Sequence, residues 1–171
     1  MLIKRICSYF LLVLILFTAL SSCKIYRFKD VNIDPEIKTV KVNYIDNKAR
    51  YVNPQLSPQL SDKLRQKINN QTSLTQVQGD DADLEISGTI MQYSVTTSGI
   101  SNQQAASDRL NVSVHIVIKN RRDDKKGREE DVTRNFDFSA SLSFDQAQAQ
   151  LLGTIVQNLT DEIFNHIFSN W

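Results

Sequence analysis

The chain has 171 residues, of which 41% are hydrophobic and 23% are charged, and its formal net charge at pH 7 is +1. This length suits one domain with a core of its own, so no disulfide framework is needed to stabilise it. The near-neutral charge argues against a nucleic-acid-binding protein, which would normally carry an excess of basic residues.

Residues 1–22 have the pattern of a secretory signal peptide. Two basic residues precede an apolar run over residues 6–20, and about fifteen residues are too few for a transmembrane helix, which needs roughly 20. The run ends in L-S-S-C, which resembles the bacterial lipobox, the signal in which the cysteine is acylated and becomes the first residue after cleavage. We therefore predict lipidation at Cys23. The alternative is an ordinary signal peptide with an incidental cysteine, but no A-x-A cleavage site precedes Cys23.

Acylation at Cys23 would anchor the domain to a membrane. Each buried CH₂ group contributes about 0.8 kcal/mol, so the several acyl chains of a bacterial lipoprotein give an effectively permanent attachment. Cleavage would leave 18 of the 20 basic residues against 19 acidic ones, a net charge of −1, and would remove Cys7, the other cysteine. We expect no disulfide and no second membrane span.

The mature chain is expected to begin with a tether, a strand and a helix. Residues 23–36 form the lipidated tether, and residues 37–45 alternate as a strand with Tyr44 on its apolar face. Asn53 and Pro54 predict the start of a helix, with asparagine as N-cap and proline in the first position. An apolar residue then recurs every four positions, at Leu56, Leu60, Leu64 and Ile68.

Two further strands are predicted in the middle of the chain. Residues 84–95 form the first, and a change of phase in its apolar positions predicts a bulge near residues 88–92. Residues 96–107 are polar and contain glycine, which is typical of a loop. Residues 110–118 alternate cleanly as the next strand.

The last third of the chain is predicted to hold a charged turn, a strand and a long helix. Residues 120–131 form the tip of a charged hairpin, and residues 132–140 alternate as a fourth strand. Ser143 and Gln146 have the spacing of a capping box, and a wide apolar face follows to about residue 168.

The order β-α-β-β-β-α predicts an α+β fold over residues 37–171. Three consecutive strands joined by loops favour antiparallel pairing, and every element has one apolar face. We therefore expect a two-layer sandwich, a four-stranded and mostly antiparallel sheet with two helices on one face. The first strand reaches the second through a helix, so that pair is either parallel or not adjacent.

The sequence contains no recognisable catalytic constellation. Its two histidines, His115 and His166, are expected on the polar face of a strand and near a helix C-terminus. No Cys/His cluster, Gly-rich phosphate loop or calcium-loop pattern is present, and Asp80, Asp81 and Asp83 are interpreted as a solvated turn. We expect no catalytic residue, no metal and no cofactor. A hydrolase with a dispersed site is the enzymatic alternative.

Basic residues near predicted loop tips are the candidate ligand contacts. The charged tip is either a soluble turn that discourages aggregation or a site where basic groups bind phosphate, and its acidic residues weaken the second interpretation. The sheet face away from the helices is expected to be polar without strong charge, which suits solvent or the wet interior wall of a barrel. The candidate phosphate contacts are Arg109, Arg121, Arg122, Lys125 and Lys126.

An ordered set of motifs follows the L-S-S-C signal. I-Y-x-F comes just after Cys23, and the chain ends in D-E-I-F-N-x-x-F-S-N-W. Between them stand I-K-T-V-x-V from Ile37, V-N-P-x-L-S from Val52, D-L-x-x-x-G-x-I-x-x-Y-S-V from Asp83 and R-L-x-V-x-V from Arg109. Together these motifs resemble the lipopolysaccharide-assembly lipoprotein family LptE, in its Bacteroidetes-type form, over nearly the whole mature chain. Lys24 and His166 depart from the family pattern.

The resemblance implies a two-layer α+β protein that is not an enzyme and uses no cofactor. Family members plug the outer-membrane β-barrel LptD, support its assembly and help to insert lipopolysaccharide into the outer leaflet. An LptD-like barrel and lipopolysaccharide would be the partners, and the anchor would lie on the periplasmic side of the outer membrane. The basic residues named above would then contact lipopolysaccharide phosphates. The alternative is a ligand- or partner-binding accessory lipoprotein of another cell-envelope transport complex.

Overall fold

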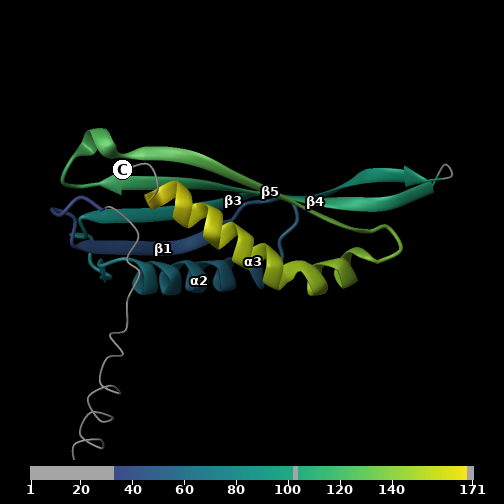
Figure 1. Cartoon of the computed structure of the whole chain (residues 1–171), viewed down its shortest axis with the longest axis horizontal. Helices are drawn as coiled ribbons and strands as arrows, with labels where there is room; N and C mark the ends of the chain where they lie inside the picture. The colour runs from purple at the N-terminus through teal and green to yellow at the C-terminus, as the bar shows by residue number, and fades with distance from the viewer. Residues whose placement is uncertain (1–32, 102–103, 169–171) are drawn as a thin grey trace, which may run out of the picture.

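The computed structural model describes residues 33–101 and 104–168, which form a five-stranded sheet with helices on one face (Figure 1). The predicted signal peptide, Cys23 and the S-N-W ending lie outside the described residues. The elements in chain order are β1 (Thr39–Asn47), α2 (Leu56–Gln71), β2 (Thr75–Gln76), β3 (Leu84–Ser101), β4 (Gln104–Asn120), the short 3₁₀ turn η2 (Asp124–Lys126), β5 (Arg128–Ser139) and α3 (Phe144–Phe168).

The predicted two-layer α+β sandwich is confirmed, but the sheet has one more strand and is mixed. The strand order is β2-β1-β3-β4-β5, with β1 parallel to both β2 and β3 and the other pairs antiparallel. Helix α2 crosses over between β1 and the rest of the sheet, which is why the two neighbours β1 and β3 run in the same direction. Strand β2 was missed because two residues carry no periodic signal.

Strand β1 differs from its predicted pattern at Tyr44. The pairing of β1 with β3 shifts between Val42 and Ile45, so that Ile45 is buried and the Tyr44 side chain is 52% exposed. The Ile45 amide donates a hydrogen bond to Ser61 Oγ on α2 at 2.9 Å. The assignment of Tyr44 to the apolar face was therefore wrong, because strict alternation cannot register an irregularity inside the strand.

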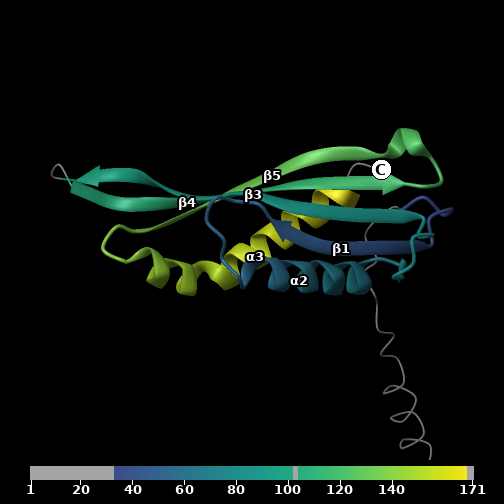
Figure 2. The same cartoon turned by 180° about the vertical axis from the view of Figure 1, so that it is seen from behind.

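The predicted loop at residues 96–107 is instead the outer half of a long hairpin. Strand β3 continues to Ser101, and β4 begins at Gln104. The predicted bulge is confirmed, since the register shifts between Ile90 and Gln92. In Figures 1 and 2 this hairpin extends past the helix layer at one end of the molecule, while η2 lies at the other end. Solvent on both faces removes the apolar alternation by which a strand is recognised.

The helices cover the other half of the sheet, and their boundaries are close to those expected. The four-residue stripe of α2 is fully buried, but α2 begins at Leu56 with Gln55 as its N-cap, two residues later than predicted. Asn53 still accepts a hydrogen bond from the Gln55 amide at 2.9 Å. The capping box of α3 is confirmed, because Ser143 N donates to Gln146 Oε1 and Gln146 N donates to Ser143 Oγ. Among the described helices, none is long and apolar enough to cross a membrane.

Candidate functional site

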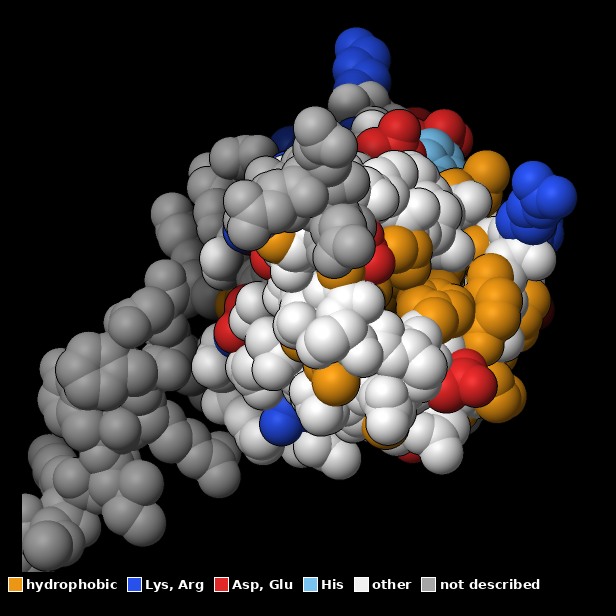
Figure 3. Space-filling view, turned by 90° about the vertical axis from the view of Figure 1, so that its right-hand side faces the viewer, with side chains coloured by type: hydrophobic (Ala, Val, Ile, Leu, Met, Phe, Trp, Pro, Cys, Tyr) orange, Lys and Arg blue, Asp and Glu red, His pale blue; other side chains and the backbone are white. Residues whose placement is uncertain are grey.

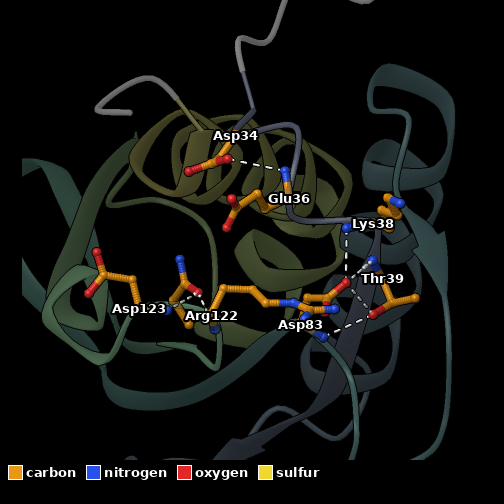
Figure 4. Close-up of polar contacts among 8 residues, drawn as sticks. Asp34, Glu36, Lys38, Thr39, Asp83, Arg122 and Asp123 are labelled. Atoms are coloured by element: carbon orange, nitrogen blue, oxygen red, sulfur yellow. Dashed lines mark hydrogen bonds and ion pairs between the residues drawn. The ribbon is translucent and has the colours of Figure 1, made fainter.

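Asp83 connects three segments at the end of the molecule that carries η2. Its Oδ2 accepts hydrogen bonds from the amides of Lys38 and Thr39 at 2.9 and 3.0 Å, and from Thr39 Oγ1 at 2.9 Å (Figure 4). Its Oδ1 accepts from Arg122 Nε at 2.6 Å. The Asp83 amide donates to Thr39 Oγ1, and its carbonyl accepts from the Arg121 amide. The start of β1, the start of β3 and the β4–β5 turn are thereby held together.

The interpretation of Asp83 as part of a solvated turn was wrong. Only 5% of the residue is exposed, and hydrogen bonds from the Lys38 amide, the Thr39 hydroxyl and amide and the Arg122 guanidinium lower its pKa from 3.8 to about 2, against the opposing effect of burial. Asp80 and Asp81 remain exposed, as predicted. Asp83 is therefore ionised at neutral pH and serves to hold the fold, which a carboxylate with this many donors does well.

The basic residues of the predicted charged tip lie near Asp83. Arg122 binds Asp83, and Lys126 Nζ binds Asp34 Oδ2 at 2.9 Å. Arg121 and Lys125 are exposed side chains of the same turn. The turn is shorter than predicted, because β5 begins at Arg128. Two of the four candidate phosphate contacts in this turn are thus already engaged with carboxylates of the chain.

Arg109 lies far from the other four candidates. It lies on β4, twelve residues before Arg121, which directly follows the end of that strand, a separation of roughly 40 Å at the rise of an extended strand. Its guanidinium makes two hydrogen bonds to the Asp137 carboxylate on β5, at 2.7 and 3.1 Å. The five candidates therefore cannot bind one phosphate group together.

The sheet face away from the helices is polar, as expected, and its side chains bind one another across the strands. Asn43 Nδ2 on β1 donates to Glu85 Oε1 and to Ser87 Oγ on β3. Thr133 on β5 donates to Ser113 on β4 at 3.1 Å. Most of these hydrogen bonds join neutral side chains on neighbouring strands. The resulting surface is hydrated, and its charged side chains have polar partners.

Both histidines lie where the sequence predicted, and both contact carboxylates. His115 Nδ1 on the polar face is 2.7 Å from Asp131 Oδ1. His166 in the last turn of α3 contacts Glu130 and Glu162. Within residues 33–101 and 104–168, no group of three or more potential ligands could hold a metal ion.

An apolar pocket that sequence reasoning missed lies where the helix layer ends beneath the hairpin. Its volume is about 400 Å³, within the range of small-molecule and side-chain pockets. Seen from the hairpin end, hydrophobic side chains form a patch on this part of the surface (Figure 3). Charged side chains of Arg50 and Asp108 also line the pocket. Its apolar lining consists of Tyr51, Tyr93, Val95, Phe138, Leu142 and Phe144.

Three aromatic rings from separate parts of the chain form one wall of this pocket. The Tyr51 ring lies edge-on to Phe144 with centroids 4.8 Å apart, and it stacks on Tyr93 at 5.9 Å. Burial raises the pKa of the Tyr93 hydroxyl, which accepts from Asn53 Nδ2. Gln148 on α3 donates to the Tyr51 hydroxyl at 3.0 Å. No local motif marks this cluster, because its members are brought together only by the fold.

Solved structures with the same fold come from several bacteria. The hypothetical protein CT253 from Chlamydia trachomatis aligns with a TM-score of 0.54 at 10% identity, over 77% of this chain and 95% of that one. A minor lipoprotein from Acinetobacter baumannii aligns with a TM-score of 0.51 at 15% identity, over 79% of this chain and 95% of that one. At these identities the likeness concerns the fold alone. A search of curated protein sequences gives no match.

Family membership rests on the sequence of the domain itself. The family model for LptE, described as lipopolysaccharide-assembly, matches residues 37–167. That range runs from just before β1 almost to the end of α3, so it includes the Asp83 cluster, the polar sheet face and the aromatic pocket. The chain therefore belongs to the LptE family of lipopolysaccharide-assembly proteins.

Proposed function

We propose that this protein is a lipoprotein, anchored through Cys23 on the periplasmic side of the outer membrane, that plugs and supports an LptD-like β-barrel during lipopolysaccharide export. The observation that carries the proposal is the LptE family match over residues 37–167. The L-S-S-C signal accounts for the proposed anchor. In the described part of the chain, no helix is long and apolar enough to cross a membrane.

The surfaces of the domain support a binding role in place of a catalytic one. His115 has carboxylate partners, but it lies on an open, hydrated face, and no cluster suited to a metal lies in the described part of the chain. A hydrated face of matched polar side chains suits close contact with the polar interior of a wide barrel. On this proposal the protein acts by binding the other components of a complex.

Copurification tests this function directly. An affinity-tagged full-length protein, extracted with detergent from outer membranes, should recover one large β-barrel protein, and depletion of the protein should lower lipopolysaccharide at the cell surface. Recovery without any large barrel partner would refute the plug. Intact surface lipopolysaccharide together with a different transport defect would favour an accessory role in another envelope complex.

Phosphate contacts are proposed at the η2 end, mainly through Arg121 and Lys125. These two side chains are exposed, whereas Arg109, Arg122 and Lys126 each bind a carboxylate of the chain. Neutral replacement of Arg121 and Lys125 by glutamine should weaken lipopolysaccharide binding at low salt, where exposed charges are least screened. If lipopolysaccharide binding is unchanged, phosphate contact by Arg121 and Lys125 is refuted. Arg109→Gln is the matched control at the other end of β4.

A further inference from the structure

Strand β3 has a free edge over Gln92–Gly99, within the part of the hairpin that extends past the helices. Pairing with β1 ends at Ile90, whose carbonyl accepts from the Lys48 amide, and in the described residues no other strand lies on that side of β3. On its other side β3 pairs with β4 through this segment. From Gln92 to Thr97, every second residue therefore directs its backbone N–H and C=O groups outward, available to another strand, and the register shift between Thr97 and Gly99 interrupts this alternation.

The other long edge of the sheet, β5, is protected in a way that this one is not. Its sequence R-E-E-D-V-T-R-N-F-D-F-S is half charged. The segment Gln92–Gly99 reads Q-Y-S-V-T-T-S-G and contains no charge and no proline. Charged residues and proline are the usual means of keeping an edge strand from pairing with other chains, and β-branched residues favour strand structure. This edge is thus suited to pairing.

The aromatic pocket borders the same edge. Tyr93, Ser94 and Val95 of β3 line it, together with Arg50 and Tyr51 from the segment that follows β1. A strand added beside β3 would continue the line of β1, and the side chains on its helix-facing side would lie next to this pocket. Three of the five large hydrophobic side chains that are exposed in the described structure belong to these two segments, namely Tyr51, Val52 and Val95, and a fourth, Met91, immediately precedes the free edge.

We propose that the β3 edge at Gln92–Gly99 binds an extended, uncharged segment of the barrel partner as an added strand, with one of its apolar side chains in the aromatic pocket. Main-chain hydrogen bonds supply affinity in this mode of recognition, and a side-chain pocket supplies specificity. The inference rests on the proposed barrel partner, and it specifies which surface of this chain engages that partner and by what geometry.

Two substitutions and one control test this edge in the full-length, membrane-anchored protein. Thr96→Lys introduces a charge into the edge, and Val95→Asp introduces one beside the pocket. Asn158→Lys, the control, places a positive charge on the exposed side of α3, away from both the β3 edge and the polar sheet face. We expect the first two to lower recovery of the barrel at least tenfold and the third to leave it unchanged, with all three proteins unfolding at similar temperatures. A photoreactive residue at position 96 should crosslink to one extended segment of the barrel, and the same residue at position 158 should not reach that segment.

The outcomes separate this inference from the proposed function. If both Thr96→Lys and Val95→Asp recover the barrel at wild-type levels, strand addition at the β3 edge is refuted, and the proposed function as a barrel plug is unaffected. A crosslink at position 96 to a second copy of this chain would overturn it in favour of a dimer. If the wild-type protein recovers no barrel, the proposed function is refuted, and so is the binding of a barrel segment at the β3 edge, which depends on it.

Discussion

The two ends of this sheet differ in which groups they bury: polar groups are buried and hydrogen-bonded at one end, whereas apolar side chains are exposed at the other. At the η2 end, Asp83 is buried, its carboxylate accepts four hydrogen bonds and its amide donates a fifth, and Lys126 binds Asp34. Toward the hairpin end, apolar side chains such as Val52 and Met91 are more than half exposed, and one edge of β3 has no strand partner among the described residues. The first arrangement stabilises the fold, and the second leaves binding capacity for a partner.

The largest effect on stability is expected at Asp83. Asp83→Ala removes the acceptor for two backbone amides and leaves Arg122 without its partner, so we expect the free energy of unfolding to fall by about 3 kcal/mol. Urea unfolding of the wild type and the variant measures this. Asp80→Ala, which removes an exposed partner of Lys41, is the control and should have little effect. Equal effects from the two would mean that the Asp83 contacts do not hold the η2 end together.

Acid should destabilise the domain through the same carboxylate. The pKa of Asp83 is about 2 in the folded protein and near 3.8 when unfolded, so its ionised form stabilises the fold above pH 4, and that contribution is lost as the pH falls from about 4 to 2. The expected loss is about 2 kcal/mol. Unfolding of the wild type and of Asp83→Asn across this range measures it, and the variant should show a smaller dependence on pH. Parallel curves would contradict the low pKa.

The sequence predicted the helix-covered half of the sheet better than the other half, and the reason is solvent. Strand β4 between Leu110 and Ile118 has one buried and one hydrated face, so its residues alternate. The outer hairpin has solvent on both faces, so residues 96–107 resembled a loop. The role of Asp83 depends on Thr39 and Arg122, which are about 40 residues away on either side. The pocket likewise joins Tyr51, Tyr93 and Phe144, and no local spacing reveals such a set.

A smaller effect is expected when an aromatic ring is removed from the hairpin end. Tyr51→Ala loses an edge-on contact with Phe144 and a hydrogen bond from Gln148, and the side chain is already 41% exposed, so about 1 kcal/mol of stability should be lost. Tyr44→Ala on β1 is the matched control, within about 0.5 kcal/mol of wild type. Barrel recovery should fall for Tyr51→Ala and not for Tyr44→Ala. A loss of several kcal/mol in the first variant would mean that this end, too, serves mainly to stabilise the fold.

The smallest effect on stability is expected at the anchor. Cys23 lies ten residues before Ile33, where the described chain begins, so the connecting segment spans at most roughly 35 Å. The chain enters the domain at the η2 end, where Asp34 binds Lys126, and the free β3 edge lies at the far end of the sheet (Figure 1). Cys23→Ser should therefore release the protein from the membrane fraction and leave the unfolding curve of the domain unchanged. A Cys23→Ser protein that is still processed and membrane-bound would refute lipidation at this residue, and with it the orientation in which the hairpin points away from the anchored end.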